Sequence, residues 1–315
     1  MPAITWCSVP WNDQYSIGVS GGERNEFQPQ IGDEMKFGIH SAFHTGSVDL
    51  AKFAARCEQL GFESLWLPEH TVIPVNPSVG PGGVAGESIP DSYLLMTDPL
   101  IGLTIAAAAT KTLRLGTGVL LVPEHHPVDL AKRISSLDFY SGGRFILGVG
   151  TGWQPEESAA LGGDFAHRWT QTSESLEIMK KLWTENEPEH HGHYHSFPKL
   201  RFHPRPVQKP HPPVLLGGSA KRLFDRVAAM ADGWAPWEIV PDKLAAGRRL
   251  LNDACERIGR AADTVSITVF TNNRDPGVIN AYSAAGADRV VITMGSMPRH
   301  NPFARLEQIA KLAAS

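Results

Sequence analysis

Histidine, glutamate and glycine residues that could bind a ligand follow apolar runs of this chain. His70 and Glu69 come directly after the apolar run Ser64–Leu67. The pair Gly118-Val119 lies near the end of another apolar run. A histidine can relay protons or donate hydrogen bonds near neutral pH, and glycine lets the backbone approach a ligand closely or take a positive φ. A lone histidine is more often structural, so its place in the fold decides between these roles.

The tripeptide Gly217-Gly218-Ser219 is the best candidate for an anion site. It lies between the short apolar run Val214–Leu216 and a predicted helix over Ala220–Ala231. A helix N-terminus offers free N–H groups and the positive end of the helix dipole. A bare Gly-Gly-Ser is usually only a turn. Its place late in an alternating chain matches the phosphate site that barrels commonly build.

The histidine-rich segment 189–195 resembles a metal-binding tract, but its spacing argues against one. No pair of histidines joins a carboxylate at clean helical spacing, and Gly192 and Pro198 favour a loop. We therefore predict no metal site. The glycine-rich run 148–152 does not match the G-x-G-x-x-G pattern, so a dinucleotide-binding Rossmann domain is disfavoured.

The elements that must position these residues alternate along the chain. Two runs, Leu113–Leu121 and Arg144–Gly150, are apolar on both faces, as in a covered parallel sheet. Eight strand-helix repeats predict a (β/α)8 TIM barrel, because a doubly wound sheet usually stops at five or six strands. The other predicted strands are Lys36–Ala42, Ser64–Leu67, Val214–Leu216, one beginning at Trp234, Val265–Phe270 and Arg289–Thr293. The predicted helices are Val48–Leu60, Pro99–Thr110, Pro127–Tyr140, Thr172–Thr184, Ala220–Ala231, Lys243–Gly259, Val278–Gly286 and Pro302–Ala313.

Two connections are longer than a simple barrel needs. Thr71–Thr97 follows strand 2, and Asn186–Pro213 lies before strand 5. Long loops in compact domains are usually functional or disordered. The first leaves a carboxyl end and is expected at the active face, while the second is long enough to fold over a rim. Residues 1–34 are polar and turn-rich, so we predict an N-terminal extension before a catalytic barrel domain over 35–315.

Composition disfavours several classes of function. The 315 residues carry a net charge of -4, which gives no basic surface for nucleic acid. No apolar run is long enough to span a membrane, and the first residues lack the pattern of a secretion signal. The cysteines Cys7, Cys57 and Cys255 are odd in number and far apart. We expect reduced thiols in a cytoplasmic protein that acts on a small molecule.

Several of these segments resemble a known family in the order in which they occur. Gly61–His70, Leu115–Leu120 and Arg144–Trp153 resemble strands two, three and four of the bacterial-luciferase-like monooxygenase superfamily. Pro213–Ser219 and Ala231–Trp234 resemble strands five and six. The resemblance covers about residues 36 to 295. Its Gly-Gly-Ser and Asp-Gly-Trp-Ala pieces are most similar to the branch of oxidoreductases that use the deazaflavin coenzyme F420.

The resemblance implies an oxidoreductase that transfers a hydride between coenzyme F420 and an unidentified organic substrate. The alternative within the superfamily is an FMN-dependent monooxygenase that uses reduced flavin and oxygen. A metal-dependent barrel hydrolase and a cofactor-binding protein without catalysis are the other classes, since fold alone decides none of them. Barrels of this family are commonly homodimers. The Ala-rich helix Ile101–Ala109 could pack against a partner or against the barrel itself.

The resemblance also implies roles for single residues. It places His70 beside the flavin-type ring as a hydrogen-bond donor or proton relay, with Glu69 orienting it or facing the cofactor. It implies a non-proline cis peptide at Gly118-Val119, where an ordinary buried strand is the alternative. The cofactor phosphate is expected on the Gly-Gly-Ser turn, that is, on Gly217, Gly218 and Ser219.

Gly152, Trp153 and Trp234 complete the cofactor residues that we expect. Some deazaflavin dehydrogenases of the family carry an acidic residue where this chain has Trp153. A sugar-phosphate dehydrogenase role that needs that carboxylate is therefore in doubt. Glu156 and Glu157 are candidates to replace it, although both fit the commoner pattern of first-turn helix charges.

Overall fold

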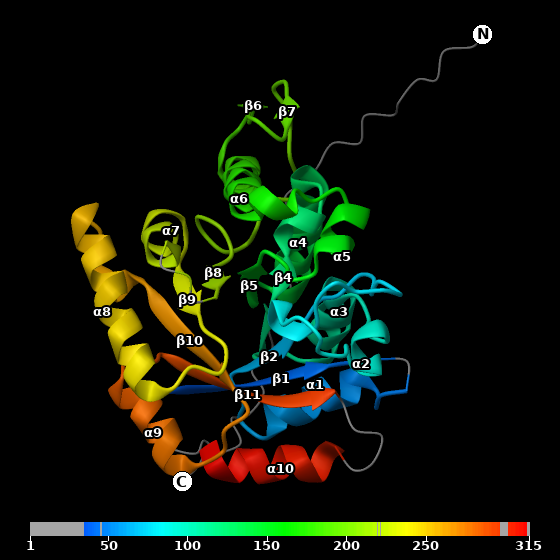
Figure 1. Cartoon of the computed structure of the whole chain (residues 1–315), viewed down its shortest axis with the longest axis vertical. Coiled ribbons are helices and arrows are strands. Elements are labelled where there is room, and N and C mark those ends of the chain that lie inside the picture. Colours follow the sequence, from blue (N-terminus) through cyan, green and yellow to red (C-terminus); the bar gives the residue numbers. More distant parts are fainter. Residues whose placement is uncertain (1–34, 45, 219, 221, 297–301, 314–315) are drawn as a thin grey trace, which may run out of the picture.

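The computed structural model describes residues 35–44, 46–218, 220, 222–296 and 302–313, and in this part of the chain a barrel of eight parallel strands is closed by hydrogen bonds. Figure 1 shows the strands at the centre of the molecule and the helices around them. This confirms the predicted TIM barrel. The barrel strands are β1 (Lys36–Ala42), β2 (Ser64–Leu67), β3 (Arg114–Thr117), β5 (Phe145–Gly150), β8 (Val214–Gly217), β9 (Gly233–Ala235), β10 (Ser266–Thr271) and β11 (Arg289–Ser296), with a short β4 (Leu120–Leu121) beside β5.

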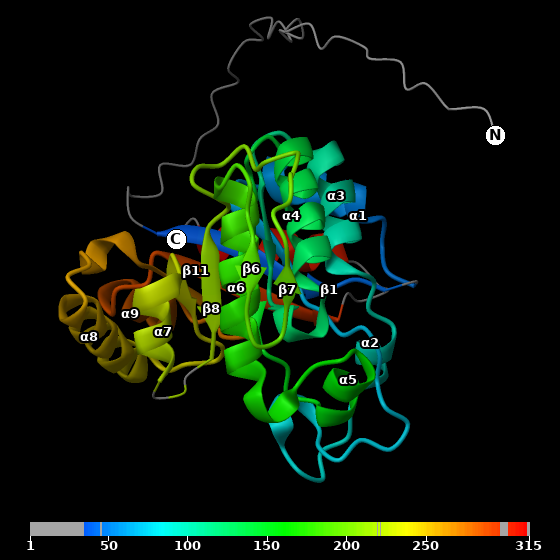
Figure 2. The same ribbon diagram turned by 90° about the horizontal axis from the view of Figure 1, so that it is seen from above.

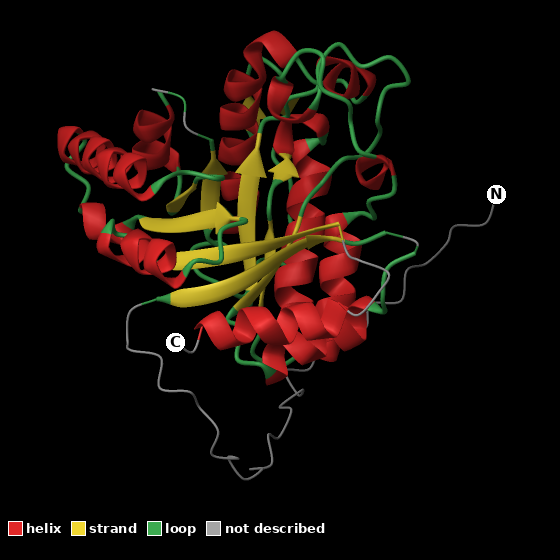
Figure 3. Ribbon diagram, turned by 60° about the horizontal axis from the view of Figure 1, so that its bottom comes forward, coloured by secondary structure: helices red, strands yellow, loops and turns green. Residues whose placement is uncertain are grey.

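The strands follow one another around the barrel in chain order, and β1 pairs with β11 to close it. Helices cover the outside, as the red ribbons around the yellow strands in Figure 3 show. Each strand is therefore buried on both faces, which is why the strand sequences are almost wholly apolar. The helices are α1 (Leu50–Gln59), α2 (Asp91–Leu94), α3 (Pro99–Ala109), α4 (Pro127–Ser141), α5 (Pro155–Ala160), α6 (Arg168–Thr184), α7 (Leu223–Met230), α8 (Pro241–Arg257), α9 (Pro276–Ala284) and α10 (Pro302–Ala313).

The barrel interior is a small packed core of its own. A Cβ atom on Gly116 would lie 2.1 Å from the ring of Trp66, so the glycine makes room for that indole. Gly116 thus accommodates a side chain of the neighbouring strand. The interior core consists of Trp66, Ile146, Leu215, Ala235, Phe270 and Val291.

An ion pair closes the barrel at the amino ends of the strands. Arg289, the first residue of β11, binds both carboxylate oxygens of Glu63 at 2.6 and 2.7 Å. It also donates to the hydroxyl of Thr268 at 3.0 Å, and its guanidinium lies 5.7 Å from the Trp66 ring centre. Such two-point pairing of arginine with a carboxylate fixes geometry as well as charge. The opposite, carboxyl end of the barrel carries the long loops.

Three predicted elements need correction. The helix expected over Thr172–Thr184 begins at Arg168. The strand expected over Leu113–Leu121 is interrupted at Gly118-Val119, so that it forms β3 and β4. The helix expected from Ala220 begins at Leu223, because the Leu223 amide donates to the Ala220 carbonyl in a tight turn first. The glycine turn and the helix are therefore separated by a further turn. The 3.6-residue pattern could not show this extra turn.

The insertion after β2 folds over the end of β5, as expected. It contains α2 and a short 3-10 helix at Pro81–Gly83. The side-chain amide of Gln154 donates to the Val79 carbonyl at 3.2 Å, and the Ser78 amide donates to Glu156 at 3.2 Å. Figure 2 shows this cyan segment beside α5.

The insertion before β8 contains a hairpin that sequence reasoning missed, formed by β6 (His190–His191) and β7 (Ser196–Phe197). Glu174 on α6 accepts hydrogen bonds from the amides of His193 at 3.0 Å and His195 at 2.8 Å. This carboxylate fixes the hairpin turn to the helix. Among the described residues, no helix is both long and apolar enough to cross a membrane.

Candidate active site at the carboxyl ends of the strands

The Gly118-Val119 peptide bond is cis, as the family resemblance implied. The Gly118 carbonyl accepts a hydrogen bond from Nε2 of His40 at 2.9 Å, and Nδ1 of His40 lies 3.0 Å from the Thr293 hydroxyl. Because a carbonyl only accepts, Nε2 carries the hydrogen and Nδ1 accepts from threonine. Burial lowers the pKa of His40 to about 4, although the bond to Gly118 opposes this. His40 is therefore neutral at pH 7.

The side chain of Val119 joins the cis peptide to the end of β8. A Cβ on Gly217 would lie 3.5 Å from Cγ1 of Val119, and a Cβ on Gly150 would lie 2.5 Å from its Cγ2. The structure therefore brings Gly118, Val119 and Gly217 to one place, although they come from different strand ends.

His70 is held by a buried carboxylate that follows β5. Its Nδ1 lies 2.7 Å from Oε2 of Glu157, and the other oxygen of Glu157 accepts from the amides of Thr71 at 2.8 Å and Val72 at 3.2 Å. The histidine side chain is 6% exposed and that of Glu157 is fully buried. The carboxylate thus orients the imidazole and also fixes the start of the first insertion.

Two aromatic rings lie beside His70. The Trp153 ring centre is 5.1 Å from the imidazole and meets it edge-on, and the Tyr93 ring centre is 5.2 Å away. Burial raises the pKa of Tyr93. Trp153, expected from the sequence, and Tyr93, from the first insertion, thus form an aromatic wall with His70.

Glu69 is buried and binds partners other than His70. Its Oε2 accepts from the Leu121 amide at 2.7 Å, and Nε2 of His125 lies 3.0 Å from its Oε1. Nδ1 of His125 in turn accepts from Arg133 at 3.0 Å. Glu69 therefore connects β2 to the end of β4, and the carboxylate beside His70 is Glu157.

Glu124, at the end of the 3-10 helix Val122–Glu124, is a third buried acid at this face. Oε1 of Glu124 lies 3.0 Å from where a Cβ on Gly152 would be, and Gly152 has a φ of 77°. Burial, with the nearby charges of Glu157 and Glu69, raises the pKa of Glu124 to about 9. Its carboxyl group is therefore protonated at pH 7.

The glycine turn after β8 exposes backbone rather than side chains. Gly218 has a φ of 111°, a conformation that favours glycine. Its carbonyl accepts from Nε1 of Trp234 at 2.8 Å. The indole of Trp234 is buried against Phe224 of α7, so Trp234 supports the turn from behind. Ser219 lies outside the described residues.

The histidines of the second insertion form no metal centre in the described part of the chain. The His195 ring lies 5.1 Å from that of His126, which precedes α4. The hairpin thus reaches the rim of the barrel.

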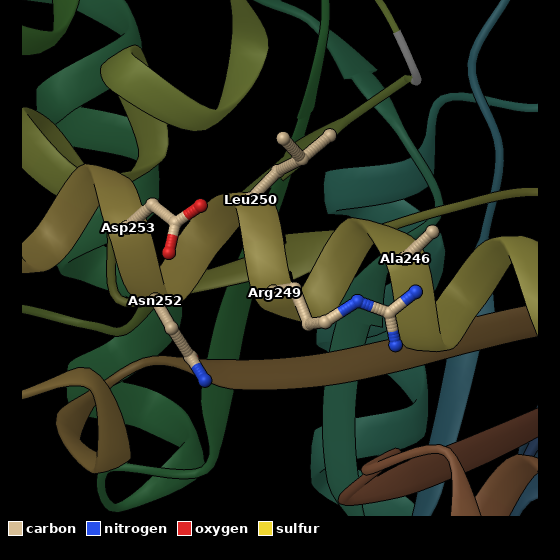
Figure 4. Close-up of a pocket in the computed structure, with 5 residues that line it drawn as sticks. All are labelled: Ala246, Arg249, Leu250, Asn252 and Asp253. Atoms are coloured by element: carbon tan, nitrogen blue, oxygen red, sulfur yellow. The ribbon is translucent and has the colours of Figure 1, made fainter.

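A separate hollow lies on the outer surface of α8, shown in Figure 4. All its lining residues come from that one helix and none from a strand end. It therefore lacks the converging polar groups of a ligand site. The lining residues are Ala246, Arg249, Leu250, Asn252 and Asp253.

Sequence reasoning missed His40, Glu124 and Tyr93, and it considered Glu157 only as a substitute acid. His40 lies in the first predicted strand and Glu124 directly follows the third, so position at a carboxyl end was an available signal for both. Tyr93 lies in a segment without periodicity, where no signal existed.

Comparisons with known proteins agree with this geometry. The family model for luciferase-like monooxygenases matches residues 35–274. An uncharacterized protein of Mycobacterium tuberculosis is 33% identical over 284 residues, which cover 89% of this chain and 99% of that protein.

Two solved structures share the fold at low identity. An F420-dependent secondary alcohol dehydrogenase, solved with an F420-acetone adduct, has a TM-score of 0.70 at 14% identity and covers 89% of this chain and 99% of its own. The oxygenating constituent of 3,6-diketocamphane monooxygenase from Pseudomonas putida, solved with FMN, has a TM-score of 0.67 at 17% identity, with coverage of 89% and 98%. With a barrel closed as predicted and a family model that matches most of its length, the chain belongs to the luciferase-like monooxygenase family.

Proposed function

We propose that this protein binds coenzyme F420 and transfers a hydride between that deazaflavin and a small organic substrate. The observation that carries the proposal is the meeting of the Gly118 carbonyl, neutral His40, the Val119 side chain and Gly217 at one barrel face. The site supplies a fixed backbone and an uncharged imidazole, which suit a flat, largely apolar ring system.

The residues present fit a ring with a phosphate-bearing tail. A Cβ on Gly217 would lie 3.2 Å from the Val149 carbonyl, so a side chain there would fill the space beside the Val119 methyl groups. In the proposal Gly118, Val119, Gly152, Trp153 and His70 line the ring. The turn of Gly217, Gly218 and Ser219 holds the phosphate, and Trp234 supports it.

The bound deazaflavin would supply the carbon that accepts or gives the hydride. The protein's part is orientation. His40 fixes the Gly118 carbonyl through a buried hydrogen bond, and Glu157 fixes His70. In the proposal His70 acts on the ring as a hydrogen-bond donor or proton relay, and Glu69 acts at a distance by holding β2 to the β4 exit through Leu121 and His125.

An FMN-dependent monooxygenase is the second candidate. Two observations favour it: the matched family model describes monooxygenases, and the FMN-containing neighbour covers as much of this chain as the F420-dependent one. The aromatic wall of His70, Tyr93 and Trp153 suits either ring.

Titration of the purified protein with F420 and with FMN, each followed by absorbance and fluorescence, tests the proposal. We expect saturable binding of F420 and at least tenfold weaker binding of FMN, about 1.4 kcal/mol. Tighter binding of FMN would establish the second candidate. Binding of neither cofactor would refute both.

We further propose that residues 35–315 form the catalytic unit of a cytoplasmic homodimer, after an N-terminal extension over 1–34. Ile101 and Ile105 of α3 are 66% and 46% exposed and lie one helical turn apart, so they offer an apolar stripe to a partner. Sedimentation at micromolar protein should give the dimer mass, and Ile101→Glu with Ile105→Glu should give the monomer. A monomeric native protein would contradict the dimer.

A further inference from the structure

Three buried carboxyl groups lie beside the carboxyl ends of β2, β4 and β5, and two of them are fully engaged. Glu69 binds a backbone amide and His125, and Glu157 binds two backbone amides and His70. Glu124 differs from both. It is 6% exposed, and neither of its carboxyl oxygens has a hydrogen-bond partner among the described residues.

The position of Glu124 shows where a partner would come from. Its Oε1 faces the exit of β5, because it lies 3.0 Å from the place of a Cβ on Gly152. Two residues further on, Oε1 of Gln154 is also buried with no hydrogen-bond partner among the described residues. Buried polar groups in folded proteins almost always have a partner. Two unpartnered groups at neighbouring strand exits therefore point to a ligand.

The charges around Glu124 decide what it can offer that ligand. Backbone amides and histidines satisfy the carboxylate oxygens of Glu69 and Glu157. A third negative charge beside them, in a buried position, is unfavourable, and the pKa of Glu124 is raised accordingly. Two basic groups at this face, His125 and His70, are already bound to the other two acids. Glu124 is therefore an O–H donor.

We propose that Glu124 is the proton donor to a carbonyl group of the substrate, an inference that rests on the proposed function for its hydride source. The carbonyl oxygen accepts a hydrogen bond from the Glu124 hydroxyl. The reduced deazaflavin of the proposed function would supply the hydride for the carbonyl carbon, and Glu124 gives its proton to the carbonyl oxygen. The substrate is reduced to an alcohol, the cofactor is oxidised, and the Glu124 carboxylate regains a proton from water.

Infrared difference spectroscopy tests this assignment without relying on turnover. A protonated carboxyl group has a carbonyl stretch that carboxylates lack. We expect such a band in the native protein at pH 7, absent from Glu124→Gln and lost as the pH rises past about 9. Glu189→Gln, the same change at an exposed position, should leave the band intact. A spectrum without a band that depends on Glu124 would overturn the proposal.

The ligand is then probed with acetone, cyclohexanone and benzaldehyde at saturating concentration, each added to the free protein and to the protein loaded with cofactor. A shift of the Glu124 band to lower frequency with any of the three supports the proposal. A shift caused by F420 or FMN alone, with none from the carbonyl compounds, would assign Glu124 to the cofactor and overturn the substrate role. No shift in any sample would overturn it too.

Absorbance of the same samples separates this inference from the proposed function. Failure of both cofactors to bind would refute the function, while the response of the free protein to carbonyl compounds would still decide the role of Glu124. Glu124→Gln keeps the size and polarity of the side chain, so its unfolding curve at pH 7 provides the control for folding.

Discussion

The two ends of the candidate site are built in opposite ways. At the end formed by β2, β4 and α5, buried carboxylates bind backbone amides and histidines, as Glu157 binds His70. At the end after β8, the surface is the bare backbone of Gly217-Gly218, supported from behind by Trp234. The end near β2, β4 and α5 therefore depends on hydrogen bonds made by its side chains. The end after β8 depends on the lack of side chains at its glycines. Removing atoms should damage the first end, and adding atoms should damage the second.

The largest effect is expected from Glu157→Ala. The change leaves the amides of Thr71 and Val72 and the imidazole of His70 without their acceptor in a buried place. Breaking a buried, charged hydrogen-bond network costs about 3 kcal/mol in the free energy of unfolding. Urea denaturation at pH 7 measures it. Glu177→Ala, which removes an exposed ion pair with Lys181, should cost less than about 0.5 kcal/mol. Equal losses in the two variants would contradict the comparison.

The second effect is the loss of cofactor binding in Gly218→Glu. A bulky anion on this turn would clash with the cofactor phosphate and repel it, so we expect affinity to fall about a hundredfold or more, roughly 2.7 kcal/mol. Fluorescence titration measures this. Gly218→Ala is the control for backbone strain at a φ of 111°, because it adds a side chain without a charge. Gly259→Glu is the control for the substitution itself, because it makes the same change at a positive-φ glycine far from the site. Undiminished affinity in Gly218→Glu would refute the proposal that this turn binds the cofactor phosphate.

A third prediction concerns His70 at the side-chain end. His70→Ala should change cofactor affinity by less than about threefold, since the proposal places the phosphate on the Gly217-Gly218 turn, yet slow turnover about tenfold, or ~1.4 kcal/mol of barrier. Steady-state rates with F420 and a substrate found by screening measure it, and His191→Ala on the exposed hairpin strand is the matched control. If turnover were unchanged, His70 would be a structural residue.

The last prediction is a pH dependence of stability at the side-chain end, which amounts to at most ~1.4 kcal/mol for each pH unit. The pKa of His40 is lowered to about 4 from 6.5, so unfolding takes up a proton in that window and stability is lost as the pH falls through it. The pKa of Glu124 is raised to about 9 from 4.5, so unfolding releases a proton there and stability falls as the pH rises.

Above about pH 6.5 only Glu124 of this pair acts. The free energy of unfolding should then fall by at most ~1.4 kcal/mol per pH unit up to about pH 9. Urea denaturation at several pH values should show this slope in the native protein and a flatter one in Glu124→Gln. Parallel slopes would mean that Glu124 is ionised in the folded state.

Apolar patterning predicted much of the fold because covered strands and capped helices have local signals. The strands Lys36–Ala42 and Ser64–Leu67 and the helix Pro302–Ala313 have the predicted bounds. The errors come from contacts between distant segments. Nothing near Gly116 in sequence shows that the Trp66 ring occupies the space beside it, and the turn before Leu223 depends on local hydrogen bonds that hydrophobic periodicity does not encode.

The candidate site shows the same limit. Position after a strand predicted that His70 and Gly118 lie at one face, because carboxyl ends converge in a barrel, and the fold places both after carboxyl ends. The bond from His40 to the Gly118 carbonyl joins residues 78 positions apart, so only the closed barrel reveals it. The unpartnered state of Glu124 is likewise a property of its three-dimensional surroundings. Only the fold shows that neither carboxyl oxygen of Glu124 has a hydrogen-bond partner among the described residues.

The ion pair of Arg289 with Glu63 has a consequence for the route by which ligands enter and leave the barrel. That pair lies across the amino ends of the strands, and the Trp66 indole packs beside it. The barrel interior is therefore closed at its amino end and accessible from its carboxyl end. Under the proposed function, cofactor, substrate and product would then all enter and leave at the carboxyl end. If the cofactor stays bound between turnovers, each substrate would bind on top of it. Each product would then leave before the next substrate binds.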